Sequence, residues 1–151
     1  MKTGKAIIVL AAGVAGAAWA QEPQLTLRDL EGKSPRKLSK DEVTQLMTGA
    51  KMSRVSARGN RHYWVNDASG SFIASSDNMG GGGTVVGAGR PSTAQGKWHV
   101  SDDGRYCILI DWRGVPPEEW CRYVLLTSDG YYTVRSESVG TERVYKFEIG
   151  K

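Results

Sequence analysis

The chain has 151 residues, of which 40% are hydrophobic and 24% are charged, and its formal net charge is +4. Two of its 20 Lys and Arg residues lie within residues 1–20, so the remainder carries 18 basic and 16 acidic side chains, a net charge of +2. This small excess argues against nucleic-acid binding, which requires strong, clustered basic patches.

Residues 1–20 have the three parts of a secretory signal peptide. Lys2 and Lys5 precede an apolar stretch over residues 6–18, and Ala18-Trp19-Ala20 provides the small side chains of a cleavage site. The stretch is shorter than the roughly 20 apolar residues of a transmembrane helix. We therefore expect cleavage after Ala20, no membrane span in the mature chain and a periplasmic or secreted location. An uncleaved N-terminal anchor is the alternative.

Cys107 and Cys121 are the only two cysteines. In an oxidising compartment, such a pair predicts one structural disulfide. A redox pair would have the spacing Cys-x-x-Cys, and a structural zinc site would need four closely spaced ligands. The sequence shows neither pattern, so we expect a disulfide, no metal site and no cofactor.

The segment 21–37 contains few large apolar residues and includes Pro23 and Pro35. It is expected to form an extended arm with a short strand over residues 25–30. Next, Ser39 and Glu42 have the spacing of a capping box. The sequence predicts a short helix over residues 40–48 that ends at Gly49.

From Lys51 onward, short β-type segments alternate with turn residues, which is typical of an all-β barrel or sandwich. The expected strands span residues 52–57, 61–66, 71–75, 84–88, 97–101, 105–112, 120–127, 131–136 and 143–149. The strands 105–112 and 120–127 are apolar on nearly both faces, so the helix and the arm are expected to cover them. If the cysteines pair across a hairpin, its loop centres near Gly114.

No catalytic motif is present. His62 and His99 are the two histidines, and His99 is expected to point to solvent. Asp111 lies within an apolar segment, so it is either partly buried and paired with Arg113 or Arg122, or placed at the mouth of its strand. Glu118 and Glu119 are interpreted as solvated loop acids.

The best candidates for a binding surface are Trp112, Pro116, Pro117 and Trp120, because two tryptophans flank a stiff Pro-Pro loop at the base of which a disulfide is expected. The alternative is that both tryptophans pack in the core. Arg54, Arg58 and Arg61 could form a basic edge toward anionic envelope polymers, or simply a solvated face.

Part of the pattern resembles a family of exported proteobacterial proteins, the domain of unknown function 995 family. The matching motifs are Leu38-Ser39-Lys40-Asp41-Glu42-Val43-x-x-Leu46-x-x-Gly49, Gly96-x-Trp98-x-Val100-x-x-x-Gly104-x-x-Cys107, and Trp120-Cys121. The resemblance covers about half of the mature chain, supplies no catalytic residue and implies a compact, lipocalin-like β-barrel.

We therefore predict a mainly β domain over residues 38–151, an antiparallel meander forming a small barrel or half-barrel with one short N-terminal helix. The expected function is that of an exported, non-catalytic protein that binds an envelope protein, a glycan or a small apolar ligand. A wide pocket lined by Trp64, Trp98 and Tyr106 would favour the apolar ligand, whereas a filled core with an exposed Trp112–Trp120 loop would favour a protein or glycan partner. The alternative is a hydrolase acting on cell-envelope polymers, which requires His62 or His99 to contact a serine or carboxylate in a cleft.

Overall fold

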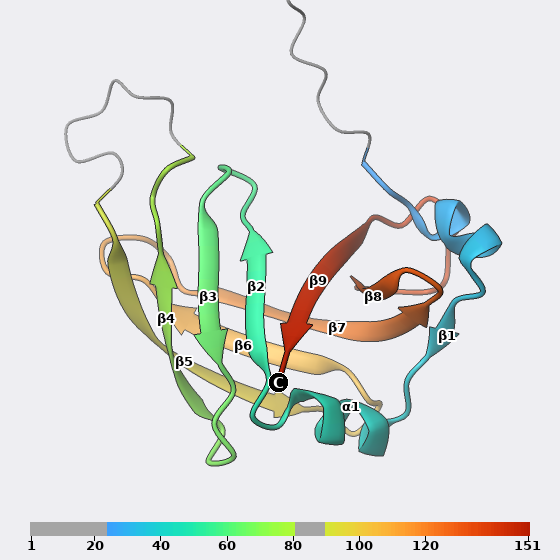
Figure 1. Cartoon of the computed structure of the whole chain (residues 1–151), viewed down its shortest axis with the longest axis horizontal. Coiled ribbons are helices and arrows are strands. Elements are labelled where there is room, and N and C mark those ends of the chain that lie inside the picture. Colours follow the sequence, from blue (N-terminus) through green and yellow to red (C-terminus); the bar gives the residue numbers. More distant parts are fainter. Residues whose placement is uncertain (1–23, 81–89) are drawn as a thin grey trace, which may run out of the picture.

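The computed structural model describes residues 24–80 and 90–151 (Figure 1). The predicted signal peptide, the expected strand over residues 84–88 and most of the glycine run near residue 80 lie outside these residues. The elements in chain order are η1 (Leu27–Lys33), β1 (Arg36–Lys37), α1 (Lys40–Met47), β2 (Lys51–Val55), β3 (Arg61–Val65), β4 (Ser71–Ser76), β5 (Ser92–Val100), β6 (Tyr106–Asp111), β7 (Glu118–Thr127), β8 (Gly130–Val134) and β9 (Val144–Gly150).

Strands β2 to β9 form a closed antiparallel barrel, which confirms the predicted fold class. The sheet order is β1-β7-β6-β5-β4-β3-β2-β9-β8, and pairing between β7 and β8 closes it. Strand β1 extends one edge of β7, where Arg36 pairs with Leu126. Strand β5 begins at Ser92, five residues before the expected strand, so that it pairs with β4 along the whole of that strand.

Alternate residues of each strand point into the barrel, and these make the main core. On β5, for example, Ala94, Gly96 and Trp98 are buried, whereas Gln95 and Lys97 between them are exposed. Gly96 lies opposite Phe72, whose ring fills the space that a larger residue would occupy. The interior of the barrel is therefore packed with side chains over this part of its length.

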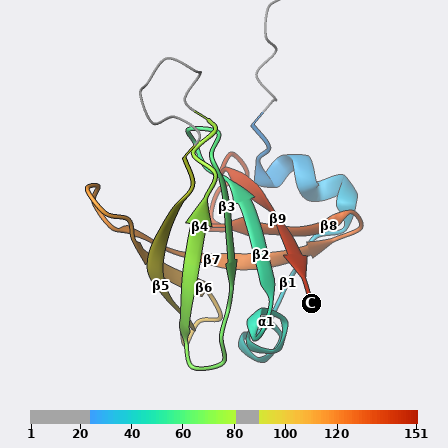
Figure 2. The ribbon, with the colours of Figure 1, turned by 60° about the vertical axis from the view of Figure 1, so that its left-hand side comes forward.

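Helix α1 closes one end of the barrel (Figures 1 and 2). It begins with the predicted capping box, in which Ser39 Oγ accepts from the Glu42 amide and the Glu42 carboxylate accepts from the Ser39 amide. Val43 and Met47 pack into the barrel core, and the Met47 carbonyl accepts a hydrogen bond of 3.0 Å from the Asn66 side chain. The helix thus covers the barrel end rather than the outer face of β6.

The N-terminal segment differs from the expected extended strand, because residues 27–33 form a 3₁₀ helix, η1. Thr26 and Asp29 provide a capping box for it, with the Thr26 amide donating to Asp29 at 2.7 Å. Leu30 of η1 is buried against a second cluster on the outer face of the barrel, made by Leu125, Tyr132, Val134 and Val144. The segment therefore covers the outer side of β7, as expected, together with that of β8, for which no cover was expected, and it does so in a helical conformation.

The predicted disulfide between Cys107 and Cys121 is present, with an S–S distance of 2.06 Å. The two residues are direct partners in the antiparallel pairing of β6 and β7, on the outer face of the barrel. The hairpin between them turns at Gly114, whose positive φ of 79° suits glycine. The disulfide therefore fixes the base of the hairpin that carries Trp112 to Trp120. Within the described residues, no helix has the length and apolar character needed to cross a membrane.

Candidate functional site

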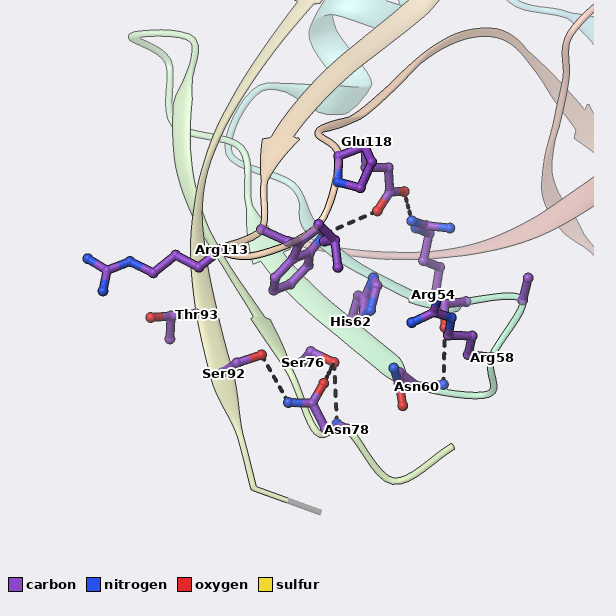
Figure 3. A pocket seen from close by; sticks show the side chains of 15 residues that line it. Arg54, Arg58, Asn60, His62, Ser76, Asn78, Ser92, Thr93, Arg113 and Glu118 are labelled. Atoms are coloured by element: carbon purple, nitrogen blue, oxygen red, sulfur yellow. Dashed lines mark hydrogen bonds and ion pairs between the residues drawn. The ribbon is translucent and has the colours of Figure 1, made fainter. Parts of the chain in front are cut away.

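A cavity of about 760 Å³ lies at the end of the barrel opposite α1. Four segments meet there: the β2–β3 turn, the end of β4, the start of β5 and the β6–β7 hairpin. The lining residues are Arg54, Ser56, Ala57, Arg58, Asn60 and His62; Ser76 and Asn78; Ser92 and Thr93; and Trp112, Arg113, Val115, Pro116 and Glu118 (Figure 3). Three arginines and one acid thus line this cavity.

Of the two alternatives for the barrel interior, the described part of the chain shows the filled core below the cavity and not a pocket lined by Trp64, Trp98 and Tyr106. These three side chains are buried. The Trp64 indole donates to the Tyr106 hydroxyl at 3.1 Å, and that hydroxyl donates to Asn66 Oδ1 at 2.8 Å. The Trp98 indole donates to the Asp67 carbonyl at 2.8 Å. The polar atoms at the centre of the barrel are therefore satisfied by one another.

Glu118 is the charged anchor of the cavity, and the interpretation of this residue as a solvated loop acid is wrong. Its side chain faces inward and forms an ion pair with Arg54 of β2 (Figure 3). It also accepts hydrogen bonds from the indole nitrogens of Trp112, at 3.2 Å, and Trp120, at 3.0 Å. One carboxylate thus holds a guanidinium and both tryptophans. Glu119 is exposed, as expected.

His62 lies directly opposite Arg54 in the pairing of β2 and β3 and packs against Trp112, with ring centroids 4.9 Å apart. Only 7% of the residue is exposed, and its Nδ1 has no hydrogen-bond partner. Burial, reinforced by the charge of Arg54 and opposed by that of Asp77, lowers the pKa of His62 to about 4. The imidazole is therefore neutral near pH 7.

Arg122 is a second buried cation behind the cavity. Its guanidinium lies between the rings of Trp120, at 4.4 Å, and Tyr145, at 4.1 Å, and its Nε has no hydrogen-bond partner. Burial lowers its pKa. The predicted pairing of Arg122 with Asp111 is wrong, because Asp111 is exposed on the outer face of β6 and forms no ion pair with either arginine in the described part of the chain.

The charge of Arg122 also affects Arg54. Burial, and then repulsion from Arg122, lowers the pKa of Arg54 to about 10. Arg54 remains protonated at neutral pH, and its Nε has no hydrogen-bond partner. Arg54, His62 and Arg122 thus each leave one buried nitrogen without a hydrogen-bond partner among the described residues.

The opposite rim is held by hydrogen bonds around Asn78, a residue with a positive φ of 52°. Its side-chain amide donates to the Arg90 carbonyl and to Ser92 Oγ, and its carbonyl oxygen accepts from Ser76 (Figure 3). The rim polar groups therefore bond mainly to each other.

The predicted binding residues occupy three different environments. Trp112 and Pro116 line the cavity. Pro117 is exposed and is not part of the lining, and Trp120 is buried beneath the cavity in edge-on contact with Tyr106 and Phe147.

Of the predicted basic edge, Arg54 and Arg58 line the cavity, whereas Arg61 lies near Glu148, at 3.9 Å. Neither His62 nor Glu118 was predicted as a binding residue, and His62 was considered only as a catalytic histidine of the alternative hydrolase. Residues two apart in a strand point to the same face. Arg54 is two residues from the apolar Met52, and His62 is two residues from Trp64. This spacing is the signal that could have placed Arg54 and His62 on the inner face.

The hydrolase prediction requires a histidine bonded to a serine or carboxylate. His62 Nδ1 has no partner, and His99 is exposed on β5. Among residues 24–80 and 90–151, no group of three or more His, Cys, Asp or Glu side chains could hold a metal ion.

A second hollow of about 770 Å³ lies on the outer face of β3 to β6, near the exposed side chains of Val65, Ile73 and Leu109. It contains no buried charged group, so the cavity at the barrel end is the stronger candidate site.

Comparison with known proteins places the chain in a family without a known function. No curated protein and no solved structure matches it. A family model described as a protein of unknown function, DUF995, matches residues 9–136, which is most of the chain. The chain therefore belongs to the DUF995 family.

Proposed function

We propose that this chain is an exported, periplasmic binding protein that holds a small ligand in the cavity at the open end of its barrel. The observation that carries the proposal is the cavity itself, because the other end of the barrel is filled by side chains and closed by α1. A volume of about 760 Å³ is in the usual range of small-molecule sites.

The walls of the cavity are held in place before any ligand arrives. Glu118 fixes Arg54 and both indoles, and the disulfide fixes the hairpin that bears Trp112 and Pro116. A site ordered in advance loses less conformational entropy on binding. This rigidity favours recognition of a small molecule by the cavity over capture of a partner by a flexible loop.

Export is supported by two features. The leader-like sequence of residues 1–20 is typical of a secretory signal. The disulfide is a bond that persists mainly in oxidising compartments.

The proposal is tested by expressing the full chain in a bacterial host and recording a native mass spectrum of the protein recovered from the periplasm. We expect a chain that begins at Gln21, has lost two hydrogens at its cysteines and retains a bound small molecule. Full-length protein in the cytosol with two free thiols would contradict export.

A pair of variants on β5 locates the ligand. Ser92→Trp places a large ring in the cavity, whereas Gln95→Trp places the same ring on the exposed outer face of the same strand. The bound molecule should be lost in Ser92→Trp and retained in Gln95→Trp. Its retention in a folded Ser92→Trp protein would exclude the cavity as the binding site.

A further inference from the structure

Two buried nitrogens beneath the inner wall of the cavity have no hydrogen-bond partner among the residues that the structure describes. They are Nε of Arg54 and Nδ1 of His62. The two residues are direct partners across β2 and β3, both side chains point into the barrel and both line the cavity. Buried polar groups in folded proteins nearly always have a hydrogen-bond partner, so this wall of the cavity is short of acceptors, although neither nitrogen is itself accessible from the cavity.

The charge around these nitrogens is unbalanced. Among the described residues, Glu118 is the only acid that lines the cavity, and it already holds Arg54 and the indoles of Trp112 and Trp120. Arg122 adds a second buried guanidinium close enough to lower the pKa of Arg54. Cationic groups that outnumber their acids in a half-enclosed site attract an anion and bind it strongly.

The remaining wall is apolar. Trp112, Val115 and Pro116 of the β6–β7 hairpin line the cavity on the side of His62, against which Trp112 packs. A ligand that fits both parts has an oxyanion at one end and an uncharged, largely apolar body.

We infer that the ligand of the proposed binding function is a small organic anion whose carboxylate or phosphate group is held by Arg54 and His62, with its apolar part against Trp112. Arg54 supplies its positive charge, and the neutral imidazole of His62 supplies one N–H donor. This inference rests on the proposed function and specifies the chemical class of its ligand.

The test compares three probes of similar shape on the mature, oxidised protein: hexanoate, hexyl phosphate and the uncharged hexanamide. Binding is followed by NMR, through the backbone amides of the lining residues and the imidazole of His62. We expect one of the two anions to bind at least about tenfold more tightly than hexanamide, because hydrogen bonds to a charged group are the stronger kind. The tighter of the two anions identifies the head group as carboxylate or phosphate.

The anion should also raise the pKa of His62 from about 4 toward its ordinary value of 6.5, because a negative charge beside the ring favours protonation. Arg54→Gln should abolish the preference for the anion, whereas Arg28→Gln, which removes the same charge from the exposed surface of η1, should not. Arg54→Lys keeps the charge and should weaken binding of the anion less than Arg54→Gln does. The comparison of probes on the unaltered protein remains decisive if an Arg54 variant does not fold.

Two outcomes would overturn the inference. One is equal affinity for hexanamide and both anions; the other is an anion that shifts no signal from the cavity. If either occurs while Ser92→Trp still removes the molecule retained in the native mass spectrum, the anion inference fails and the proposed function stands. If Ser92→Trp has no effect on that molecule, the proposed function itself fails.

Discussion

Arg54 and Glu118 form an ion pair across the mouth of the barrel, between β2 and β7, which are not neighbours in the sheet. The pair connects two strands whose backbones share no hydrogen bonds. Glu118 also accepts hydrogen bonds from both tryptophans of the β6–β7 hairpin. This one carboxylate therefore holds in place both the wall of the cavity that the hairpin forms and the charged side chain of Arg54.

Glu118→Gln should therefore destabilise the protein more than an ordinary surface substitution. It leaves the partly buried Arg54 without the carboxylate that pairs with it. Since 15% of the Arg54 side chain and 23% of the Glu118 side chain are exposed, we expect a loss of about 2 kcal/mol, below the value for fully buried pairs. Urea denaturation measures this loss.

The control is Glu119→Gln, because Glu119 is the exposed neighbour on the same strand. It should change the free energy of unfolding by less than about 0.5 kcal/mol. Equal effects of the two substitutions would mean that the ion pair contributes nothing to stability.

Gly96→Ala should also be destabilising, for a steric reason. A Cβ at residue 96 would lie 1.9 Å from Cε2 of Phe72, inside the packed core. Displacing the ring should cost about 1 to 3 kcal/mol. In Gly32→Ala, by contrast, the new Cβ would meet no atom within 4 Å, so thermal melting of the two variants side by side isolates the packing effect.

Loss of the disulfide should lower the free energy of unfolding by about 3 kcal/mol, because Cys107 and Cys121 close a loop with a sequence separation of 14. The double variant Cys107→Ala/Cys121→Ala should show this loss in urea. Dithiothreitol should reproduce it in the parent protein and have no effect on the double variant. A parent protein insensitive to dithiothreitol would argue against a stabilising role for the bond.

The fold was predictable because its signals are local. The Ser39–Glu42 spacing predicts α1. The single pair of cysteines, with Gly114 midway between them, predicts a disulfide across a hairpin. The segment predicted as an extended arm was the exception. Thr26 and Asp29 have the spacing of a capping box, but few apolar residues surround them, so the sequence does not indicate a helix. The helix depends instead on the packing of Leu30 against β8.

The site was only partly predictable, because the direction in which a side chain points depends on pairing between distant strands. In β2, Met52 and Val55 are both apolar but lie on opposite faces, so the spacing from Met52 shows that Arg54 points inward only once Met52 is known to be the core residue. Glu118 lies beside an exposed glutamate and two prolines, and only its pairing with Ile110 places it inside. The sequence predicted the two tryptophans as binding residues, but it did not predict that the carboxylate of Glu118 holds them in place.

The protonation of His62 should make the protein less stable in mild acid. The folded-state pKa is about 4 and the ordinary value is 6.5, so the unfolded chain takes up this proton first as the pH falls. The stability associated with the neutral ring is therefore complete above about pH 6.5 and is lost as the pH falls toward 4, by an amount on the order of 3 kcal/mol. Hydrogen bonds from Ser101 and Arg105 lower the pKa of Asp103 to about 2, so the protonation of Asp103 affects the free energy of unfolding only at lower pH.

The measurement is the free energy of unfolding in urea at several pH values between 4 and 7. His62→Gln should remove most of the pH dependence in this range, because glutamine does not titrate. His99→Gln, at the exposed histidine of β5, should leave the dependence unchanged. An unaltered slope in His62→Gln would show that other groups cause the pH dependence and that His62 is not held neutral by its burial beside Arg54.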